Sequence, residues 1–522
     1  MRRLLAAVVA VFALVAAGCG GGSHTTLTVL AGSELKDLQP LLGQIEHATG
    51  VRLQLDYVGT LDGTQQLIAG GDTHDLAWFS HSKYLQLLQQ EKGLKVVHAE
   101  TPIMLSPVVL GVKHSVAVRL GWSGSGKVTW SDIAEAAKAG RLRFAMTNPG
   151  SSNSGFTALV GVASAFAGSA DALDAGRIDT QAMKDLFAGQ KLTAGSSGWL
   201  ADAYVQSQDR LDGMINYESV LLELNQSGKL HEKLDLIYPA EGIVTANYPL
   251  LLLDESRRAA YDKLVEYLLS PDFQEAMMKQ TLRRPVTPGV MLDPRLPHRL
   301  LVELPFPATV KTINAILFAY LNKARPPAHA TFVLDISGSM GSNGKIESLR
   351  RALSGLTGLD TTVTGVFSQF HDREQLSFIR FSSSTYPPVD FTVEGTDTQT
   401  GAYARIRSFV DGLKPYGGTA IYSALIEAYR VTAKAQATDP SRYYSIVLMT
   451  DGENNAGPDA AAFKRFYNAL PARARQIRTF TVLFGDASAQ ALTQIAELTG
   501  GKLFDARSAS LSSVFKDIRG YQ

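Results

Sequence analysis

The sequence predicts an α/β protein built from two separate blocks, on three observations. Short apolar runs alternate with longer segments of helical periodicity from residue 27 to about residue 290, and the alternation resumes at residue 328. Between the blocks, residues 293–327 hold six prolines that interrupt a helical pattern, which indicates a domain boundary. The 522 residues, 45% of them hydrophobic, are enough for two to four domains at roughly 150 residues each.

The first block begins with a strand–helix–strand–helix–strand pattern. β-branched and apolar runs predict strands at 27–31, 52–58 and 75–79, and helical periodicity predicts helices at 34–48 and 63–69. This order is typical of a doubly wound parallel sheet, which binds ligands at the carboxyl ends of its strands. A second α/β unit is expected at 107–244, followed by a strand at 243–253 and a helix at 256–269.

The last block, 328–522, is predicted to be another alternating α/β unit. Its expected strands are 331–335, 376–381, 444–450, 478–484 and 502–505.

Charge and cysteine content exclude several classes of protein. Fifty Lys and Arg residues against 49 Asp and Glu leave a net charge of +1, without a long basic run, so we expect no nucleic-acid partner. The single cysteine excludes an intramolecular disulfide, a CxxC redox pair and a zinc site built from cysteines.

That cysteine, Cys19, follows a leader-like segment. A basic start at residues 1–3 precedes an apolar run at 4–17 and the small residues before Cys19. The segment resembles a bacterial lipoprotein signal, which implies a signal peptide at 1–18, lipidation of Cys19, and a Gly-rich tether at 19–26. We therefore expect a lipid-anchored protein on the extracytoplasmic face of the cell membrane; an ordinary secretory signal with an incidental cysteine is the alternative.

Oxygen-bearing side chains cluster at the expected strand ends of the last block. Asp335, Ser337 and Ser339 follow one apolar strand, Asp451 follows another, and a glycine turn presents Thr419. Hard oxygen ligands without His or Cys suit Mg²⁺, Mn²⁺ or Ca²⁺. A capped helix start is the simpler interpretation of Asp-x-Ser-Gly-Ser alone.

Asp-x-Ser-x-Ser, the later Thr and Thr-Asp-Gly together resemble the metal-ion-dependent adhesion site of von Willebrand factor A (VWA) domains, over residues 328–521. The resemblance implies a Rossmann-like doubly wound fold. It also implies a metal set of Asp335, Ser337, Ser339, Thr419 and Asp451, and a protein partner that supplies an acidic residue to the metal.

The first block carries hydroxyl groups just past its strand ends and at the helix start near residues 148–155. Ala-Gly-Ser-Glu at 31–34, Thr-Asn-Pro-Gly-Ser-Ser-Asn-Ser-Gly at 147–155, Asn-Tyr-Glu-Ser at 216–219 and Tyr-Pro at 248–249 resemble type II periplasmic solute-binding proteins. The resemblance implies a two-lobed domain at 27–292, with lobe I at about 27–106 and 245–292 and lobe II at about 107–244. It implies a cleft for a small anionic or zwitterionic solute, with these candidate residues: Ser33, Thr60, Ser80, Ser152, Ser154 and Tyr217.

Two motifs suggest enzymes but do not fit. The stretch 121–128 nearly spells a P-loop, yet Val128 replaces the Ser or Thr that holds Mg²⁺. Residues 195–198 do not match the Gly-x-Ser-x-Gly nucleophile elbow. A metal-dependent hydrolase needs a general base, for which Glu453 is the nearest candidate in sequence. We expect a binding protein and no enzyme.

The two resemblances together predict a membrane-anchored receptor or scaffold, in which the cleft binds a solute and the VWA domain binds a protein through a divalent cation. The alternative is a solute-capture subunit of an ABC-type importer.

Overall fold

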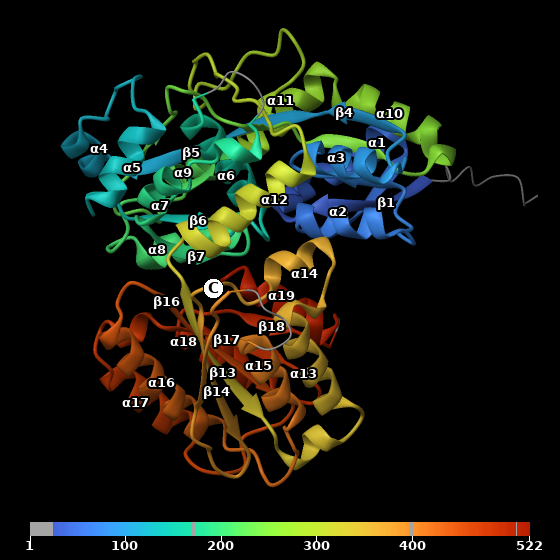
Figure 1. The fold of residues 1–522 in the computed structure, drawn as a ribbon. Coiled ribbons are helices and arrows are strands. Elements are labelled where there is room, and N and C mark those ends of the chain that lie inside the picture. The colour runs from blue at the N-terminus through green and yellow to red at the C-terminus, as the bar shows by residue number, and fades with distance from the viewer. Residues whose placement is uncertain (1–24, 169–172, 396–400, 508) are drawn as a thin grey trace, which may run out of the picture.

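The computed structural model describes residues 25–168, 173–395, 401–507 and 509–522. Cys19, the predicted signal peptide 1–18 and residues 19–24 of the predicted tether lie outside the described residues. Figure 1 shows a two-lobed amino-terminal domain packed on a carboxy-terminal domain, which is coloured orange and red. Within the described ranges, no helix combines the length and the hydrophobicity needed to span a bilayer.

Lobe I is a five-stranded sheet with strand order β2-β1-β3-β11-β4. Its strands are β1 (Thr25–Gly32), β2 (Val51–Val58), β3 (Leu76–Trp78), β4 (Ala99–Pro102) and β11 (Pro249–Leu252). Its helices are α1 (Gln39–Thr49), α2 (Thr60–Ala69), α3 (Lys83–Lys92), α10 (Arg258–Leu268) and α11 (Pro271–Thr281), with a 3₁₀ turn η1 (Ser33–Leu38). The parallel pairing of β1 with β2 and β3 confirms the predicted doubly wound pattern. β1 begins at Thr25, so its first two residues fall within the range 19–26 that was predicted as a tether.

Lobe II is a mixed sheet around the long strand β5 (Met104–Lys113). The other strands are β6 (Phe144–Thr147), β7 (Gln190–Ala194), β8 (Gly213–Tyr217), β9 (Leu234–Ile237), β10 (Thr245–Ala246) and β12 (Arg284–Pro285). The helices are α4 (His114–Leu120), α5 (Trp130–Lys138), α6 (Asn153–Phe166), α7 (Thr180–Phe187), α8 (Ser197–Ser207) and α9 (Glu218–Gln226). The stretch 121–128 follows a helix, α4, whereas a P-loop follows a strand.

The chain crosses between the two lobes between α11 and β12, and at two further points, Ile103 and Tyr248. The prediction of one strand over 243–253 is wrong, because Tyr248 has a left-handed φ of 40° that ends β10 and re-aims the chain into β11. The Tyr248 carbonyl accepts hydrogen bonds from Trp78 Nε1 at 3.0 Å and from Ile103 N at 3.4 Å, which tie the two crossings together.

The predicted connector 293–327 is folded against the amino-terminal domain. It contains α12 (Val310–Ala319), whose Asn314 Oδ1 accepts from Tyr84 Oη at 3.3 Å. Tyr320 Oη then donates to Gln190 Oε1 of lobe II at 3.0 Å. The connector therefore contacts both lobes of the amino-terminal domain.

The carboxy-terminal domain is a six-stranded sheet with strand order β15-β14-β13-β16-β17-β18. The strands are β13 (Ala328–Asp335), β14 (Gln375–Phe381), β15 (Val389–Thr392), β16 (Tyr443–Thr450), β17 (Arg478–Leu483) and β18 (Leu503–Asp505). The helices are α13 (Lys345–Ser354), α14 (Val363–Ser368), α15 (Ala402–Asp411), α16 (Ile421–Thr438), α17 (Ala460–Ala469), α18 (Ala489–Leu498) and α19 (Leu511–Arg519). All five predicted strands are present, and only the antiparallel edge strand β15 was not expected.

The carboxy-terminal domain docks on lobe II through the beginnings of its parallel strands. Tyr443 Oη, at the start of β16, donates to the Gln190 carbonyl at 2.8 Å. The Trp199 and Tyr521 rings pack edge to face at 4.9 Å within a continuous apolar cluster that includes both domains. Since β13 has eight residues, its carboxyl end lies about 25 Å away from this interface, and Figure 1 shows β13 pointing away from lobe II.

Candidate metal site and solute cleft

The end of β13 holds a buried carboxylate whose oxygens are both hydrogen-bonded. Asp335 Oδ1 accepts from Ser337 N at 2.7 Å, and Asp335 Oδ2 accepts from Thr450 Oγ1 at 2.5 Å. Burial raises the pKa of Asp335, and the hydrogen bonds from Thr450 and Ser337 oppose that rise. Because β13 and β16 are parallel neighbours, their ends bring Asp335 and Thr450 to the same edge.

The remaining predicted metal ligands converge on this edge. The Ser337 and Ser339 hydroxyls lie 3.0 Å apart, and Ser339 Oγ donates to Asp451 Oδ1 at 2.8 Å. A Cβ added to Gly452 would lie 3.6 Å from Thr419 Oγ1 and 3.8 Å from Ser339 Oγ, so these hydroxyls flank Gly452. The structure therefore gathers five side chains from three loops: Asp335, Ser337, Ser339, Thr419 and Asp451.

Sequence reasoning missed one charged neighbour of this cluster. Lys345, at the start of α13, donates from Nζ to Asp451 Oδ2 at 2.6 Å and lies 3.8 Å from Asp486 Oδ2. The side chains of Lys345 and Asp451 are 12% and 0% exposed, so their ion pair is shielded from solvent. The ammonium group thus neutralises part of the charge that a cation would meet.

The donor set fits a hard divalent cation. It combines two buried carboxylates with three hydroxyls, and it contains no soft ligand. Across the described part of the chain, no three His, Cys, Asp or Glu side chains form a metal-binding group, so a divalent ion at this edge depends on the hydroxyls. Glu453 is exposed and faces a different hollow, beside Tyr422 and Asp459.

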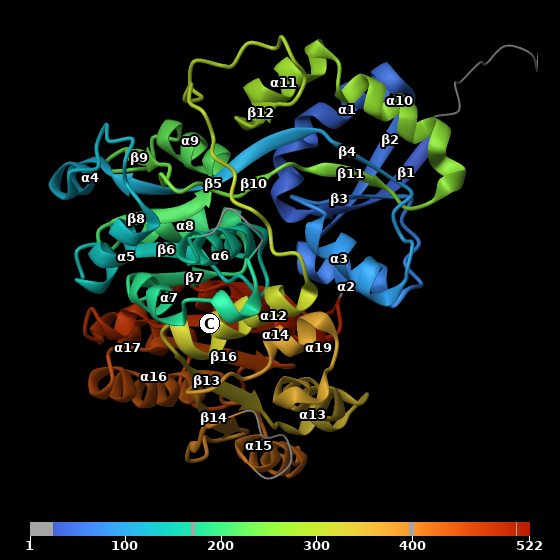
Figure 2. The ribbon, with the colours of Figure 1, turned by 45° about the horizontal axis from the view of Figure 1, so that its top comes forward.

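The amino-terminal domain has a polar cleft of about 620 Å³ whose wall includes both lobes and the carboxy-terminal domain. Lobe I contributes Ser33, Glu34, Lys36, Tyr57 and Asp62 to the wall, and lobe II contributes Ser151, Ser152, Asn153 and Ser196. The carboxy-terminal domain contributes Thr362, Thr364, Lys502, Lys516, Asp517 and Tyr521. Figure 2 shows α14 and α19 of that domain beneath the two lobes.

Glu34 connects the two lobes across the cleft. Its Oε1 atom accepts from Asn153 Nδ2 at 3.0 Å and from Tyr217 Oη at 3.4 Å, both from lobe II. Burial raises the pKa of Glu34, and the hydrogen bond from Asn153 and the charge of Arg283 oppose the rise. Arg283 donates to the Glu34 carbonyl at 3.1 Å and lies over the Tyr248 ring at 4.7 Å. The sequence analysis named neither Glu34 nor Arg283 as a site residue.

Of the six predicted cleft residues, Ser33 and Ser152 line the cavity. The other four predicted residues, Thr60, Ser80, Ser154 and Tyr217, are almost fully buried behind its wall.

Several of the buried polar atoms near the lobe junction lack partners. Thr60 Oγ1, Ser80 Oγ and Asn153 Oδ1 have no hydrogen-bond partner among the described residues, and the same holds for both ring nitrogens of His81. Burial lowers the pKa of His81 to about 4, so this ring is neutral at physiological pH. Unpaired buried polar atoms cost free energy unless water or a ligand satisfies them.

Charges of both signs line the cleft. Burial, and secondly the Asp62 carboxylate, raise the pKa of Asp517 to about 7. Burial also raises the pKa of Asp62, which the Thr364 hydroxyl and Lys516 oppose. The cleft is therefore lined by three carboxylates and three lysines: Glu34, Asp62, Asp517, Lys36, Lys502 and Lys516.

Comparison with known families agrees with both halves of this architecture. Residues 27–283 match the family model described as bacterial extracellular solute-binding protein, and residues 331–517 match the von Willebrand factor type A domain. The chain joins an extracellular solute-binding domain to a VWA domain. The fold class predicted from the sequence is therefore confirmed for both parts.

Solved structures similar to the solute-binding domain include the periplasmic binding protein AfuA from Actinobacillus pleuropneumoniae with fructose-6-phosphate bound. It is 15% identical, with a TM-score of 0.46, over 58% of this chain and 99% of that one. The ferric binding protein from Campylobacter jejuni is 13% identical, with a TM-score of 0.44, over 56% of this chain and 97% of that one.

A von Willebrand factor type A structure from Catenulispora acidiphila is similar to the VWA domain. It is 19% identical, with a TM-score of 0.30, over 38% of this chain and 43% of that one. Comparison with curated proteins gave no match.

Proposed function

We propose that this protein is an extracytoplasmic receptor or scaffold, in which the cleft binds a small solute and the VWA domain binds a protein partner through a divalent cation. The observation that carries the proposal is the position of the oxygen cluster around Asp335 and Asp451. It lies at the carboxyl edge of the VWA sheet, whereas the opposite edge docks on lobe II. A partner can therefore reach the cluster without displacing the solute-binding domain.

Asp335, Ser337, Ser339, Thr419 and Asp451 would hold the cation. A bound Mg²⁺ or Mn²⁺ supplies an electrophilic centre for an acidic oxygen of the partner. Three of the five ligands are neutral hydroxyls, which donate little electron density, so the ion stays electrophilic towards that carboxylate. Ser339 is the exposed member of the set and lies where a partner would approach.

The cleft favours a zwitterionic or polar solute over a simple anion. The Glu34 carboxylate already accepts hydrogen bonds from Asn153 and Tyr217, so a simple anion would have to compete with it for these donors. The lining carboxylates and lysines are equal in number, which suits a ligand that carries both charges. A thermal-shift panel of amino acids, sugar phosphates and dicarboxylates tests this: stabilisation by dicarboxylates alone would contradict the proposed class.

The VWA domain also argues for a receptor over an importer subunit. Lys502, Lys516 and Asp517 of that domain form part of the cleft wall, so the state of the cleft and the position of the VWA domain are coupled. Stable binding of the protein to a membrane permease, with loss of solute uptake on gene deletion, would instead support the importer subunit.

The partner is best identified by its dependence on the cation. Membrane proteins captured by the intact protein in Mg²⁺ should be released by EDTA and should not be captured by Asp335→Ala. Asp411→Ala, which removes an exposed carboxylate at the end of α15, is the control. Capture that survives both chelation and Asp335→Ala would contradict a role for the metal.

Membrane attachment is proposed to depend on Cys19. Cys19→Ser should abolish lipid labelling and move the protein out of the membrane fraction, because the diacylated residue supplies the membrane affinity. A Cys19→Ser protein that still fractionates entirely with membranes would contradict the lipid anchor.

A further inference from the structure

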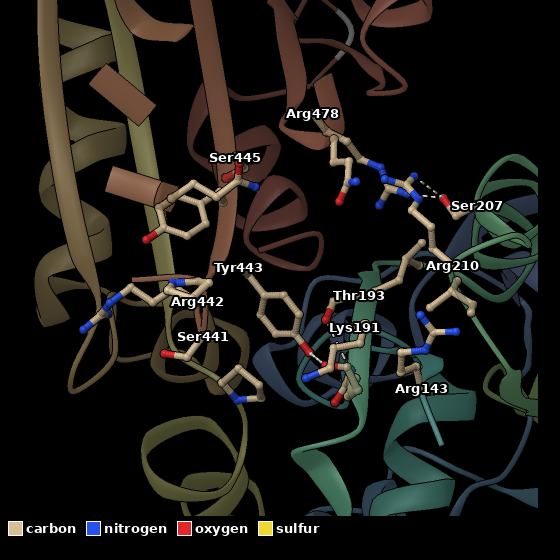
Figure 3. A pocket seen from close by; sticks show the side chains of 18 of the residues that line it. Arg143, Lys191, Thr193, Ser207, Arg210, Ser441, Arg442, Tyr443, Ser445 and Arg478 are labelled. Atoms are coloured by element: carbon tan, nitrogen blue, oxygen red, sulfur yellow. Dashed lines mark hydrogen bonds between the residues drawn. The ribbon is translucent and has the colours of Figure 1, made fainter. Parts of the chain in front are cut away.

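A second cavity, of about 370 Å³, lies between lobe II and the VWA domain (Figure 3). β7 and α8 of lobe II form one side, and the beginnings of β16 and β17 form the other. Among the residues that line it, only Tyr521 also lines the solute cleft, so the two cavities are separate sites.

The lining of this cavity is strongly basic. Six cationic side chains line it, and none of the described lining residues is Asp or Glu: Arg143, Lys191, Arg210, Arg442, Arg473 and Arg478. Outside the lining, Asp212 pairs with Arg143 at 2.9 Å and Asp439 pairs with Arg442 at 2.7 Å. The other four form no ion pair within the described ranges.

The two domains bring like charges together at Ser207. Arg210 of lobe II and Arg478 of the VWA domain each donate from Nη2 to Ser207 Oγ at 3.4 Å, and Figure 3 shows both guanidinium groups beside this serine. The Arg478 guanidinium also lies over the Trp199 ring at 5.1 Å. A serine hydroxyl cannot neutralise either charge, and neither guanidinium forms an ion pair within the described ranges, although the charge of the neighbouring Asp209 partly offsets that of Arg210.

The pKa values of three of these cationic groups are lowered as well. Burial, and then the charge of Arg210, lower the pKa of Arg478 to about 10. Burial lowers the pKa of Arg210, and burial followed by the charge of Arg143 lowers the pKa of Lys191. Uncompensated positive charge at a domain interface is relieved when an anion enters.

We propose that this cavity binds a small polyanion with two or more phosphate or carboxylate groups, held between Arg210 and Lys191 of lobe II and Arg473 and Arg478 of the VWA domain. Guanidinium groups bind such oxyanions in a bidentate manner. Four unpaired cations exceed what one monoanion neutralises, which favours a polyanion. Because the ligand would contact both domains, its binding stabilises their docked arrangement.

Calorimetric titration of the intact protein with inorganic pyrophosphate and with citrate, in buffer free of divalent ions, tests the proposal. We expect saturable binding of one anion per chain that weakens as salt is added. Arg210→Gln and Arg473→Gln change exposed side chains and should each weaken binding by about tenfold. Arg478→Gln should weaken binding at least as much, because Arg478 is the more buried of the three.

Two control variants separate this cavity from other basic sites. Lys516→Gln changes a residue that lines the solute cleft, and Arg430→Gln changes a residue of α16 that lines neither cavity. Neither should change anion affinity. Preference for pyrophosphate or for citrate identifies the anion as phosphate-like or carboxylate-like.

The absence of saturable binding by both anions would overturn the proposal. Binding that is lost in Lys516→Gln and kept in Arg210→Gln and Arg473→Gln would assign the anion to the solute cleft and would overturn it too. The exposed Arg210 and Arg473 variants keep the test valid if Arg478→Gln fails to fold.

Discussion

The candidate metal site and the candidate solute cleft differ in how many of their polar atoms are hydrogen-bonded. At the carboxyl edge of the VWA sheet, Asp335 accepts a hydrogen bond from Ser337 N, the Ser337 and Ser339 hydroxyls lie 3.0 Å apart, and Asp451 accepts from Ser339 and from Lys345. Behind the wall of the cleft, by contrast, Thr60 and Ser80 are buried without hydrogen-bond partners among the described residues. The difference indicates that the side chains of the candidate metal site hold one another in place, whereas the lobe junction behind the cleft contains buried polar atoms whose hydrogen bonding is incomplete.

The two sites also differ in how much of the chain builds them. Three loops of a single sheet supply the metal site. The cleft takes residues from both lobes and from the VWA domain, so a change in any of the three parts alters it.

The largest effect on Mg²⁺ binding is expected from Asp335→Ala. Loss of a buried carboxylate should weaken Mg²⁺ binding by about a hundredfold, or about 2.7 kcal/mol, and should remove the rise in melting temperature that Mg²⁺ produces in the intact protein. Calorimetry and thermal unfolding measure the two effects. Asp411→Ala should behave as the parent protein, and equal Mg²⁺ binding by Asp335→Ala and the parent would show that the Asp-x-Ser-x-Ser loop is only a helix cap.

Lys345→Met tests whether the Lys345 ammonium group organises the site, because the variant removes the ion-pair partner of Asp451. Breaking a buried ion pair should destabilise the metal-free protein by about 3 kcal/mol. Since the competing ammonium charge is then absent, Mg²⁺ should bind more tightly than to the parent protein and should recover most of the lost stability. Urea unfolding with and without Mg²⁺ measures both changes; unchanged Mg²⁺ affinity would show that Lys345 does not compete with the ion.

Glu34→Ala tests whether the cleft is held closed by its own side chain. The variant removes the hydrogen bonds from Asn153 and Tyr217, so the lobes should open and the free energy of unfolding should fall by about 1–2 kcal/mol. Small-angle scattering of the solute-free protein should show a larger radius of gyration. Lys36→Ala, which also lines the cleft, is the control; identical scattering from Glu34→Ala and the parent would contradict a closing role for Glu34.

The smallest effect concerns pH. Asp517 has its ordinary pKa near 3.8 when unfolded and a pKa of about 7 when folded, so the folded state binds more protons between these values. Stability should therefore fall as pH rises from about 4 to about 7, by less than about 1 kcal/mol because solvent in the cleft screens the charge. Asp517→Asn should remove this dependence, as denaturation at several pH values will show. A wild-type slope of the opposite sign, or one unchanged in Asp517→Asn, would contradict the assignment.

Sequence patterns predicted the local features of this fold well. Each strand of the VWA sheet that carries an apolar run was located within a few residues, because buried parallel strands have a composition of their own. β15 was missed because two prolines precede this four-residue edge strand. The break at Tyr248 was missed because an apolar run does not reveal a change in backbone direction.

The sequence by itself determined the strand ends and the residues of the predicted metal set, since Asp335, Ser337 and Ser339 are neighbours and parallel strands end at a common edge. Only the tertiary structure decided the rest. Arg283 and Glu34 are 249 residues apart, and the basic cavity gathers isolated cations from residues 143 to 478. Such contacts depend on how segments distant in the sequence pack together, and this packing leaves no periodic signal in the chain because each contributing residue lies alone in its own stretch of sequence.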